Sequence, residues 1–234
     1  MRFKAKTVIV TGAAGNLGSA VARRFAEEGA SVALFGHKLE KVQAVAAALD
    51  GDHAAFAVDL TDRDATKRAI EAASRQFGPP AILCAIAGGF DMGTPVHEVP
   101  AVSWQKMMDL NLGTLLSVFA AVTPGMIERG NGKIVTVGAN GAKAGGKTMG
   151  PYAASKSAVM RVTESASAEL KSHGINVNSV LPSIIDTPEN RAAMPKADSS
   201  KWVTPESLAG VIAFLCSDDA RDIHGALLPV TGLS

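Results

Sequence analysis

The sequence predicts an α/β fold: one doubly wound parallel sheet of seven strands with helices on both faces. Short aliphatic or β-branched runs alternate along the chain with longer segments that have helical periodicity. The strand runs are continuously apolar, which is typical of parallel strands buried on both faces. Right-handed crossovers between such strands would place the intervening helices on the two faces of the sheet.

Seven runs are expected to be strands, and six segments are expected to be helices. The strands are Thr7 to Val10, Ser31 to Phe35, Ala54 to Val58, Ala81 to Ala87, Lys133 to Val137, Asn176 to Leu181 and Ala226 to Val230. The helices are Asn16 to Glu28, Leu39 to Leu49, Asp62 to Phe77, Trp104 to Arg129, Tyr152 to His173 and Pro205 to Ser217. One long stretch, residues 183–204, has no regular pattern, and we interpret it as a substrate lid.

Composition limits the classes of protein and partner. The chain has 234 residues, 47% of them hydrophobic, and no repeat or linker, so we expect residues 1–234 to form one domain. The formal net charge is +1 and the basic residues are scattered, which argues against nucleic acid as a partner. The apolar run Thr7 to Val10 is too short for a signal sequence or a membrane span. We therefore expect a cytoplasmic protein without a membrane partner.

Neither the cysteines nor the histidines have the spacing of a metal or redox site. Cys84 and Cys216 lie far apart and lack CxxC spacing, so we expect two buried apolar thiols. The five histidines show no paired-ligand spacing. No metal is expected.

A glycine-rich loop follows the first expected strand and leads directly into a helix. It contains Gly12, Gly15 and Gly18, with Asn16 and Leu17 between the last two. Glycine permits a tight turn and a close approach of the backbone to pyrophosphate, while the helix N-terminus directs unpaired N–H groups at the phosphates. An ordinary turn is the competing interpretation, but the flanking strand and helix favour a Rossmann-type dinucleotide site.

The end of the second expected strand predicts which dinucleotide binds. An acidic residue there would bind the ribose hydroxyls and repel a 2′-phosphate, but this chain has Gly36, His37 and Lys38. An imidazole and an ammonium could instead accommodate a 2′-phosphate. We expect NADPH to be preferred, with NADH possible. Alternatively, His37 and Lys38 only begin a solvated helix.

Asp59 and Leu60 follow the third expected strand. The Asp59 carboxylate could accept a hydrogen bond from the adenine amino group. Its competing role is that of a helix N-cap, which Thr61 could fill instead.

Tyr152 and Lys156 stand four residues apart on one face of a predicted long helix. A free tyrosine has a pKa of about 10, and a neighbouring ammonium and an oxidised nicotinamide ring would both lower that pKa. Tyr152 is therefore predicted to be the acid that completes hydride transfer. Lys156 would also hydrogen-bond the nicotinamide ribose. The competing interpretation is an exposed pair of side chains on a helix.

Together, the glycine loop, Asp59, Ala87-Gly88, Asn111 and the YxxxK pair resemble the short-chain dehydrogenase/reductase family over nearly the whole chain. The resemblance implies that Asn111 holds a water that links Lys156 to solvent. It also implies that Thr187 contacts the nicotinamide carboxamide, in a dinucleotide-binding segment that includes Pro182 and Ile185. Alternatively, Asn111 bends a helix or forms buried hydrogen bonds, and Thr187 caps a helix before Pro188.

The chain also departs from the family pattern. Ala139 stands where members usually have a serine, thirteen residues before the tyrosine, and Asn140 and Thr136 are possible substitutes. Losing such a donor typically costs about 3 kcal/mol of transition-state stabilisation. Asn16 replaces a loop glycine, and Ala85-Ile86 replaces an asparagine pair. Asparagine tolerates left-handed backbone conformations, so Asn16 is compatible with the loop.

A narrower resemblance, to dihydropteridine reductases, fits several of these departures. It rests on the glycine spacing, on the segment from Ala81 to Phe90, on Gly138-Ala139, and on the lid residues from Leu181 to Trp202. It implies a conjugated imine substrate, which Tyr152 could protonate without a serine. The candidate substrate residues are Gly89, Phe90, Ala139, Asn140, Met149, Met194 and Trp202.

The sequence thus predicts an NADPH-dependent reductase of a small carbonyl or conjugated imine compound, pterin-like or quinonoid substrates included. A 3-oxoacyl thioester reductase and a non-catalytic dinucleotide-binding regulator are the alternatives. The helices Trp104 to Arg129 and Tyr152 to His173 have more apolar residues than one sheet face needs, and Ala226 to Leu233 is also apolar. The family resemblance implies a homodimer or homotetramer through these segments.

Overall fold

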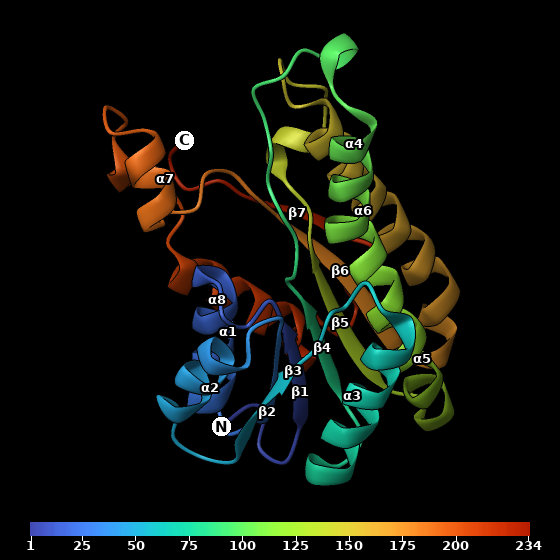
Figure 1. Ribbon diagram of the computed structural model, residues 1–234. Helices are drawn as coiled ribbons and strands as arrows, with labels where there is room; N and C mark the ends of the chain where they lie inside the picture. The colour runs from blue at the N-terminus through green and yellow to red at the C-terminus, as the bar shows by residue number, and fades with distance from the viewer.

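The computed structural model describes residues 1–234 and contains the predicted parallel sheet of seven strands (Figure 1). The strand order is β3-β2-β1-β4-β5-β6-β7, and every pairing is parallel. The strands are β1 (Thr7–Thr11), β2 (Ser31–Gly36), β3 (His53–Ala57), β4 (Ile82–Ala85), β5 (Gly132–Val137), β6 (Ile175–Pro182) and β7 (Leu227–Val230). The order reverses between β1 and β4, so their carboxyl ends mark the crevice where this architecture binds ligands.

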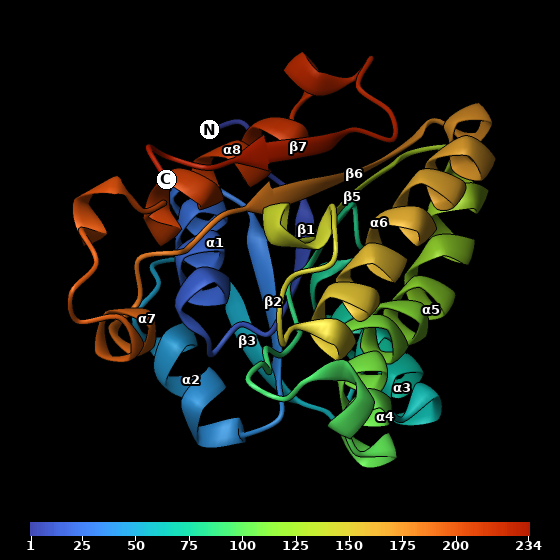
Figure 2. The same ribbon diagram turned by 90° about the horizontal axis from the view of Figure 1, so that it is seen from above.

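Helices cover both faces of the sheet (Figure 2). One side carries α1 (Asn16–Glu27), α2 (Leu39–Ala47), α7 (Pro188–Ala193) and α8 (Pro205–Leu215). The other side carries α3 (Arg63–Phe77), α4 (Ala101–Met108), α5 (Thr114–Arg129) and α6 (Gly150–Leu170). Successive residues of a strand face opposite sides, so Val8 and Val10 of β1 join one hydrophobic core while Ile9 joins the other.

The structure corrects the predictions for one strand and one helix. The strand expected to end at Ala87 ends at Ala85, because the N–H groups of Ile86 and Ala87 donate to the side-chain hydroxyl of Thr11 in β1 instead of to a backbone carbonyl of a neighbouring strand. The helix expected from Trp104 begins at Ala101, after Pro100 at its N-cap. A π-helical turn, Asp109–Gly113, then separates α4 from α5.

The segment 183–204 is more regular than predicted. It contains α7 and a 3₁₀ turn at Ser199–Lys201, and Ile185 forms a β-bridge with Val203. The Thr187 hydroxyl caps α7, and Pro188 occupies its first turn.

By length and composition alone, the helical stretch Ala101–Arg129 could span a membrane, with a mean hydropathy of 1.6 over its most apolar window. Only 39% of that window is buried, and buried residues of α5 such as Leu115, Val118 and Val122 pack in the core. Core helices of globular domains pass the same test.

Candidate active site

The glycine loop after β1 needs glycine for steric reasons. Gly12 has a φ of +64°, and a Cβ atom there would lie 3.0 Å from the backbone of Ala87. A Cβ on Gly18 would lie 2.1 Å from the Gly12 carbonyl oxygen. Larger residues at either position would therefore force the loop apart from its neighbours.

The N-terminus of α1 has the donors that an anion needs. Gly15 is its N-cap and makes no side-chain capping bond, and the first helical bond runs from Ser19 N to the Gly15 carbonyl oxygen at 2.9 Å. The N–H groups of Asn16, Leu17 and Gly18 thus donate to no protein acceptor. In contrast, side chains cap α3, α7 and α8. These free donors beside a glycine loop fit a dinucleotide pyrophosphate.

Tyr152 and Lys156 lie in the first two turns of α6, as predicted. Lys156 is 7% exposed, and its Nζ donates to the Val137 carbonyl oxygen at the end of β5, at 2.8 Å. Tyr152 is half-buried against a small cluster that includes Ala139 and Met160. Phe90 contacts the Tyr152 ring edge-on, with ring centroids 4.7 Å apart.

Burial shifts the pKa values of both groups. It lowers the pKa of the Lys156 ammonium to about 8, because the charged form loses solvation. It raises the pKa of the Tyr152 phenol above its ordinary value for the same reason. The second direction is opposite to the lowering expected from the sequence. In the chain alone, Tyr152 therefore keeps its proton, which suits a general acid.

Asn111, in the π-helical turn, is 2% exposed and fully engaged by the protein. Its Oδ1 accepts from Gly89 N at 2.9 Å, and its Nδ2 donates to the Gly89 carbonyl oxygen at 3.1 Å and to Ser155 Oγ at 2.9 Å. Ser155 Oγ in turn donates to the Tyr152 carbonyl oxygen at 2.9 Å. The predicted alternative of a buried hydrogen-bonding residue thus describes the side chain of Asn111.

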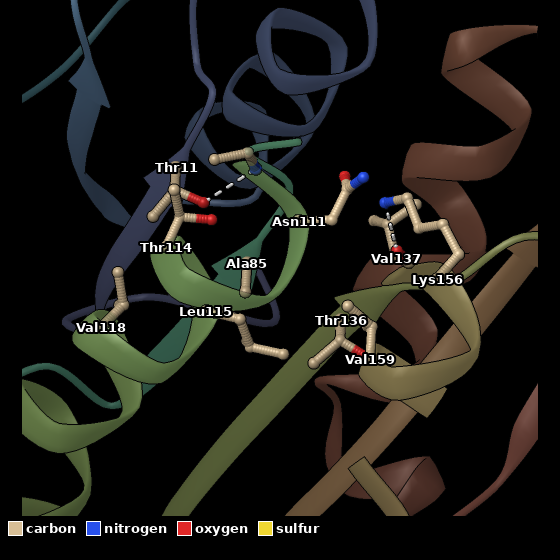
Figure 3. Close-up of a pocket in the computed structure, with 11 residues that line it drawn as sticks. Thr11, Ala85, Asn111, Thr114, Leu115, Val118, Thr136, Val137, Lys156 and Val159 are labelled. Carbon is tan, nitrogen blue, oxygen red and sulfur yellow. Dashed lines mark hydrogen bonds between the residues drawn. The ribbon is translucent and has the colours of Figure 1, made fainter. Parts of the chain in front are cut away.

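A small cavity lies between Asn111 and Lys156 (Figure 3). Its volume is about 10 Å³, close to the lower limit for one water molecule. Gly88 packs closely against the same two side chains: a Cβ there would lie 2.5 Å from Asn111 Oδ1 and 3.2 Å from Lys156 Nζ. The remaining lining residues are Thr11, Ala85, Ala87, Thr114, Leu115, Val118, Thr136, Val137 and Val159.

The residues at and around Ala139, where the family resemblance predicts a serine, differ in the hydrogen-bonding groups they offer. Ala139 is 5% exposed and packs in the cluster under Tyr152. Thr136 cannot replace the serine, because its hydroxyl is fully buried and paired with the Thr163 hydroxyl at 2.8 Å. That prediction was wrong. Asn140 begins a 3₁₀ turn, is half-buried and makes no side-chain hydrogen bond, so its amide remains available.

At the predicted adenosine end, His37 and Lys38 are exposed, and Lys38 is the N-cap of α2. This arrangement matches the predicted alternative of a solvated helix start, and it also leaves both side chains free to contact a phosphate. A Cβ on Gly36 would lie 2.5 Å from Val42, so this position needs glycine for packing.

The Asp59 carboxylate accepts from the Thr61 N–H at 2.9 Å and from the Thr61 hydroxyl at 2.7 Å. These bonds, and then the charge of His37, hold its pKa below the usual range. Neither Asp59 nor Thr61 caps α3, because Asp62 does so. Leu60 is buried beneath this turn.

The residues of the predicted lid have mainly structural partners. The Thr187 hydroxyl accepts from Asn190 N at 3.2 Å, as in the helix-cap alternative. Trp202 is 7% exposed, and its backbone lies against Gly232 near the C-terminus. Met194 ends α7 and is half-buried. Pro182 is the last residue of β6, and Met149 occupies the N-cap position of α6 without a side-chain capping bond.

Sequence reasoning missed two residues of this site. Thr11 ties the end of β1 to the start of the loop after β4, and Ser155 links Asn111 to Tyr152. Both residues carry hydroxyl groups and lie inside motifs that the sequence analysis recognised. That position was the only signal in the sequence that could have identified them.

Comparisons with known proteins agree with this architecture. The sequence profile of the short chain dehydrogenase family matches residues 6–198. Cis-4-hydroxycyclohexanecarboxylate dehydrogenase of Sinomonas cyclohexanicum is 34% identical over 98% of this chain and 96% of its own length. The structure of levodione reductase matches with a TM-score of 0.93 at 27% identity, covering 99% of this chain and 98% of that one. NAD⁺-bound xylitol dehydrogenase matches with a TM-score of 0.92 at 26% identity, covering 99% and 100%.

The chain therefore belongs to the short-chain dehydrogenase family. It is an oxidoreductase with a Rossmann-type fold.

Proposed function

We propose that this protein is an NADPH-preferring reductase of a small carbonyl or conjugated imine compound, with Tyr152 as the proton donor. The convergence of Tyr152, Lys156 and Asn111 beside the free donors of α1 carries the proposal. Residues 11–18 would hold the pyrophosphate, and Lys156 would hold the nicotinamide ribose.

When bound, the dinucleotide supplies the hydride. The Tyr152 phenol donates its proton to the oxygen or nitrogen that becomes negative as the substrate is reduced. Lys156, protonated below a pKa of about 8, places a positive charge at the base of the site and favours the resulting phenolate. A water in the cavity between Asn111 and Lys156 would then return a proton toward the site.

The preference for NADPH rests on His37 and Lys38, two exposed residues that can contact a 2′-phosphate where an acidic residue would repel it. Replacing Lys38 with alanine should weaken NADPH binding about twofold to fivefold, as expected for one exposed charge pair, and leave NADH binding unchanged. Replacing the neighbouring Lys41, which is also exposed, is the matched control. Equal loss for both dinucleotides would contradict the assignment.

The substrate proposal favours a ring compound over a polyol. Phe90 and Met92 are 59% and 52% exposed on the loop after β4, where they present apolar surface. The relatives named for cis-4-hydroxycyclohexanecarboxylate and levodione support cyclic carbonyl substrates. Ala139 removes one polar contact, so either the Asn140 amide or conjugation in the substrate would orient the reacting atom.

The decisive experiment measures NADPH oxidation with a cyclohexane-ring ketone, a quinonoid dihydropterin and an acetoacetyl thioester. Turnover of the ring ketone supports the proposal, whereas turnover of the thioester alone favours the 3-oxoacyl alternative. Replacing Tyr152 with phenylalanine should lower kcat by at least about 10³-fold with the dinucleotide Kd unchanged. A full rate in that variant would show that Tyr152 is not the acid.

We also propose that the protein works in the cytoplasm as a homodimer or homotetramer. The outward side of α5 carries exposed Ala120, Pro124 and Ile127, an apolar strip that a second copy could cover. Light scattering of the wild type and of an Ile127→Glu variant tests this. A wild type that is monomeric at micromolar concentration would contradict the proposal.

A further inference from the structure

One hydrogen bond joins the glycine loop to the lid. Asn16 Nδ2, in the first turn of α1, donates to Glu189 Oε2, in the first turn of α7, at 2.8 Å. The two residues are 173 positions apart in the sequence. Both α1 and α7 lie on the same side of the sheet (Figure 2).

The contact brings a carboxylate to the side chain of Asn16, in the same first turn of α1 as the free N–H donors. Glu189 is exposed, and the pKa of its carboxyl group is held below the usual value, first by its own backbone N–H and also by Asn16. It is therefore negative at neutral pH. The neighbouring N–H groups of Leu17 and Gly18 have no protein acceptor.

We propose that Asn16 and Glu189 form a clasp that holds α7 on the glycine loop, and that the phosphates of an arriving dinucleotide open it. This inference rests on the proposed dinucleotide function. A pyrophosphate on the free N–H groups of α1 would lie near the Glu189 carboxylate, and the two like charges would repel each other. Glu189 thus sets the dinucleotide affinity and its dependence on salt.

The chain contains a matched control for this charge. The tripeptide Thr-Pro-Glu occurs twice, at Thr187 to Glu189 and at Thr204 to Glu206, and each threonine caps the helix that follows. Glu206 is exposed and makes no hydrogen bond or ion pair with another side chain. Glu206→Gln therefore changes the net charge by the same amount without touching the clasp.

The first test measures the Kd of NADPH at low and high salt for the wild type, E189Q and E206Q. Removing one charge a few ångströms from a phosphate in water should tighten binding by E189Q about fivefold at low ionic strength. The gain in NADPH affinity of E189Q over the wild type should fall below about twofold near 0.5 M salt, because salt at this concentration screens charges within a few ångströms. E206Q should bind like the wild type. Equal Kd values for E189Q and E206Q, or weaker binding by E189Q, would overturn the clasp.

The second test reads the clasp without any dinucleotide. Asn16→Ala breaks the hydrogen bond and leaves the Glu189 charge in place, so amide hydrogen exchange in α7 should become severalfold faster than in the wild type and in E206Q. Unchanged exchange in α7 would overturn the clasp. If the wild type binds neither NADPH nor NADH, the proposed function itself fails, which is distinct from binding with no difference between E189Q and E206Q.

Discussion

The ring of Phe90 stands edge-on against the ring of Tyr152, with centroids 4.7 Å apart and ring planes at 76°. Phe90 comes from the loop after β4, whereas Tyr152 comes from the first turn of α6. Phe90 keeps 59% of its surface exposed, and Tyr152 is half-buried. The contact therefore places an open apolar face directly beside the proposed proton donor.

Replacing Phe90 with alanine should lower kcat/KM for a ring ketone about threefold to tenfold, the value of one aromatic contact. It should also move the alkaline limb of the rate to lower pH, because water would reach Tyr152 and reduce the burial that raises its pKa. Phe90→Leu keeps the apolar contact and serves as the control. If Phe90→Ala lost dinucleotide affinity by the same factor as kcat/KM, the substitution would have disturbed the fold.

Replacing Lys156 with methionine should abolish reduction and yet stabilise the protein. A pKa lowered from 10.5 to about 8 means that the buried ammonium costs about 3 kcal/mol at neutral pH. Losing the bond to the Val137 carbonyl offsets part of this, which leaves a gain of about 1–2 kcal/mol.

The pH dependence of the stability difference between the wild type and Lys156→Met distinguishes the cost of the buried ammonium from an effect of packing. The unfolded chain binds the extra proton between about pH 8 and 10.5, so wild-type stability attributable to Lys156 rises with pH across that window. The advantage of Lys156→Met should thus be full below pH 8 and disappear above pH 10.5 in urea unfolding. An advantage independent of pH would point to packing instead.

The sequence predicted the order of strands and helices, because apolar periodicity and glycine placement are local properties. It also placed Tyr152 and Lys156 on one helix face, since their spacing fixes that geometry. It could not predict contacts between distant segments. Asn111 meets Ser155 across 44 positions, Thr11 meets Ala87 across 76, and Asn16 meets Glu189 across 173. The π-helical turn was also missed, because its residues fit ordinary helical periodicity.

Ser155 should act as a positioning residue through Asn111 and Tyr152. Replacing it with alanine leaves Asn111 Nδ2 with one partner fewer and removes one donor from the Tyr152 carbonyl, which should cost about 1–3 kcal/mol of stability. We expect kcat to fall about tenfold with KM nearly unchanged, because misplaced reacting groups lower the rate more than binding. Ser157→Ala, on the same helix, removes a bond to Ala142 and is the control. A tenfold fall in kcat in Ser157→Ala as well would contradict a specific role of Ser155.

Thr148 has a φ of +58°, which is unfavourable for a β-branched residue and marks a strained turn just before α6. Its carbonyl accepts from Gly93 N at 2.9 Å, which joins the loop after β4 to the loop before Tyr152. Asparagine tolerates this conformation, so Thr148→Asn should raise the free energy of unfolding by about 1 kcal/mol, measured in urea. Thr148→Val keeps the strain and should give no gain. Because the backbone bond to Gly93 survives in both variants, a gain in both or in neither would contradict strain at Thr148.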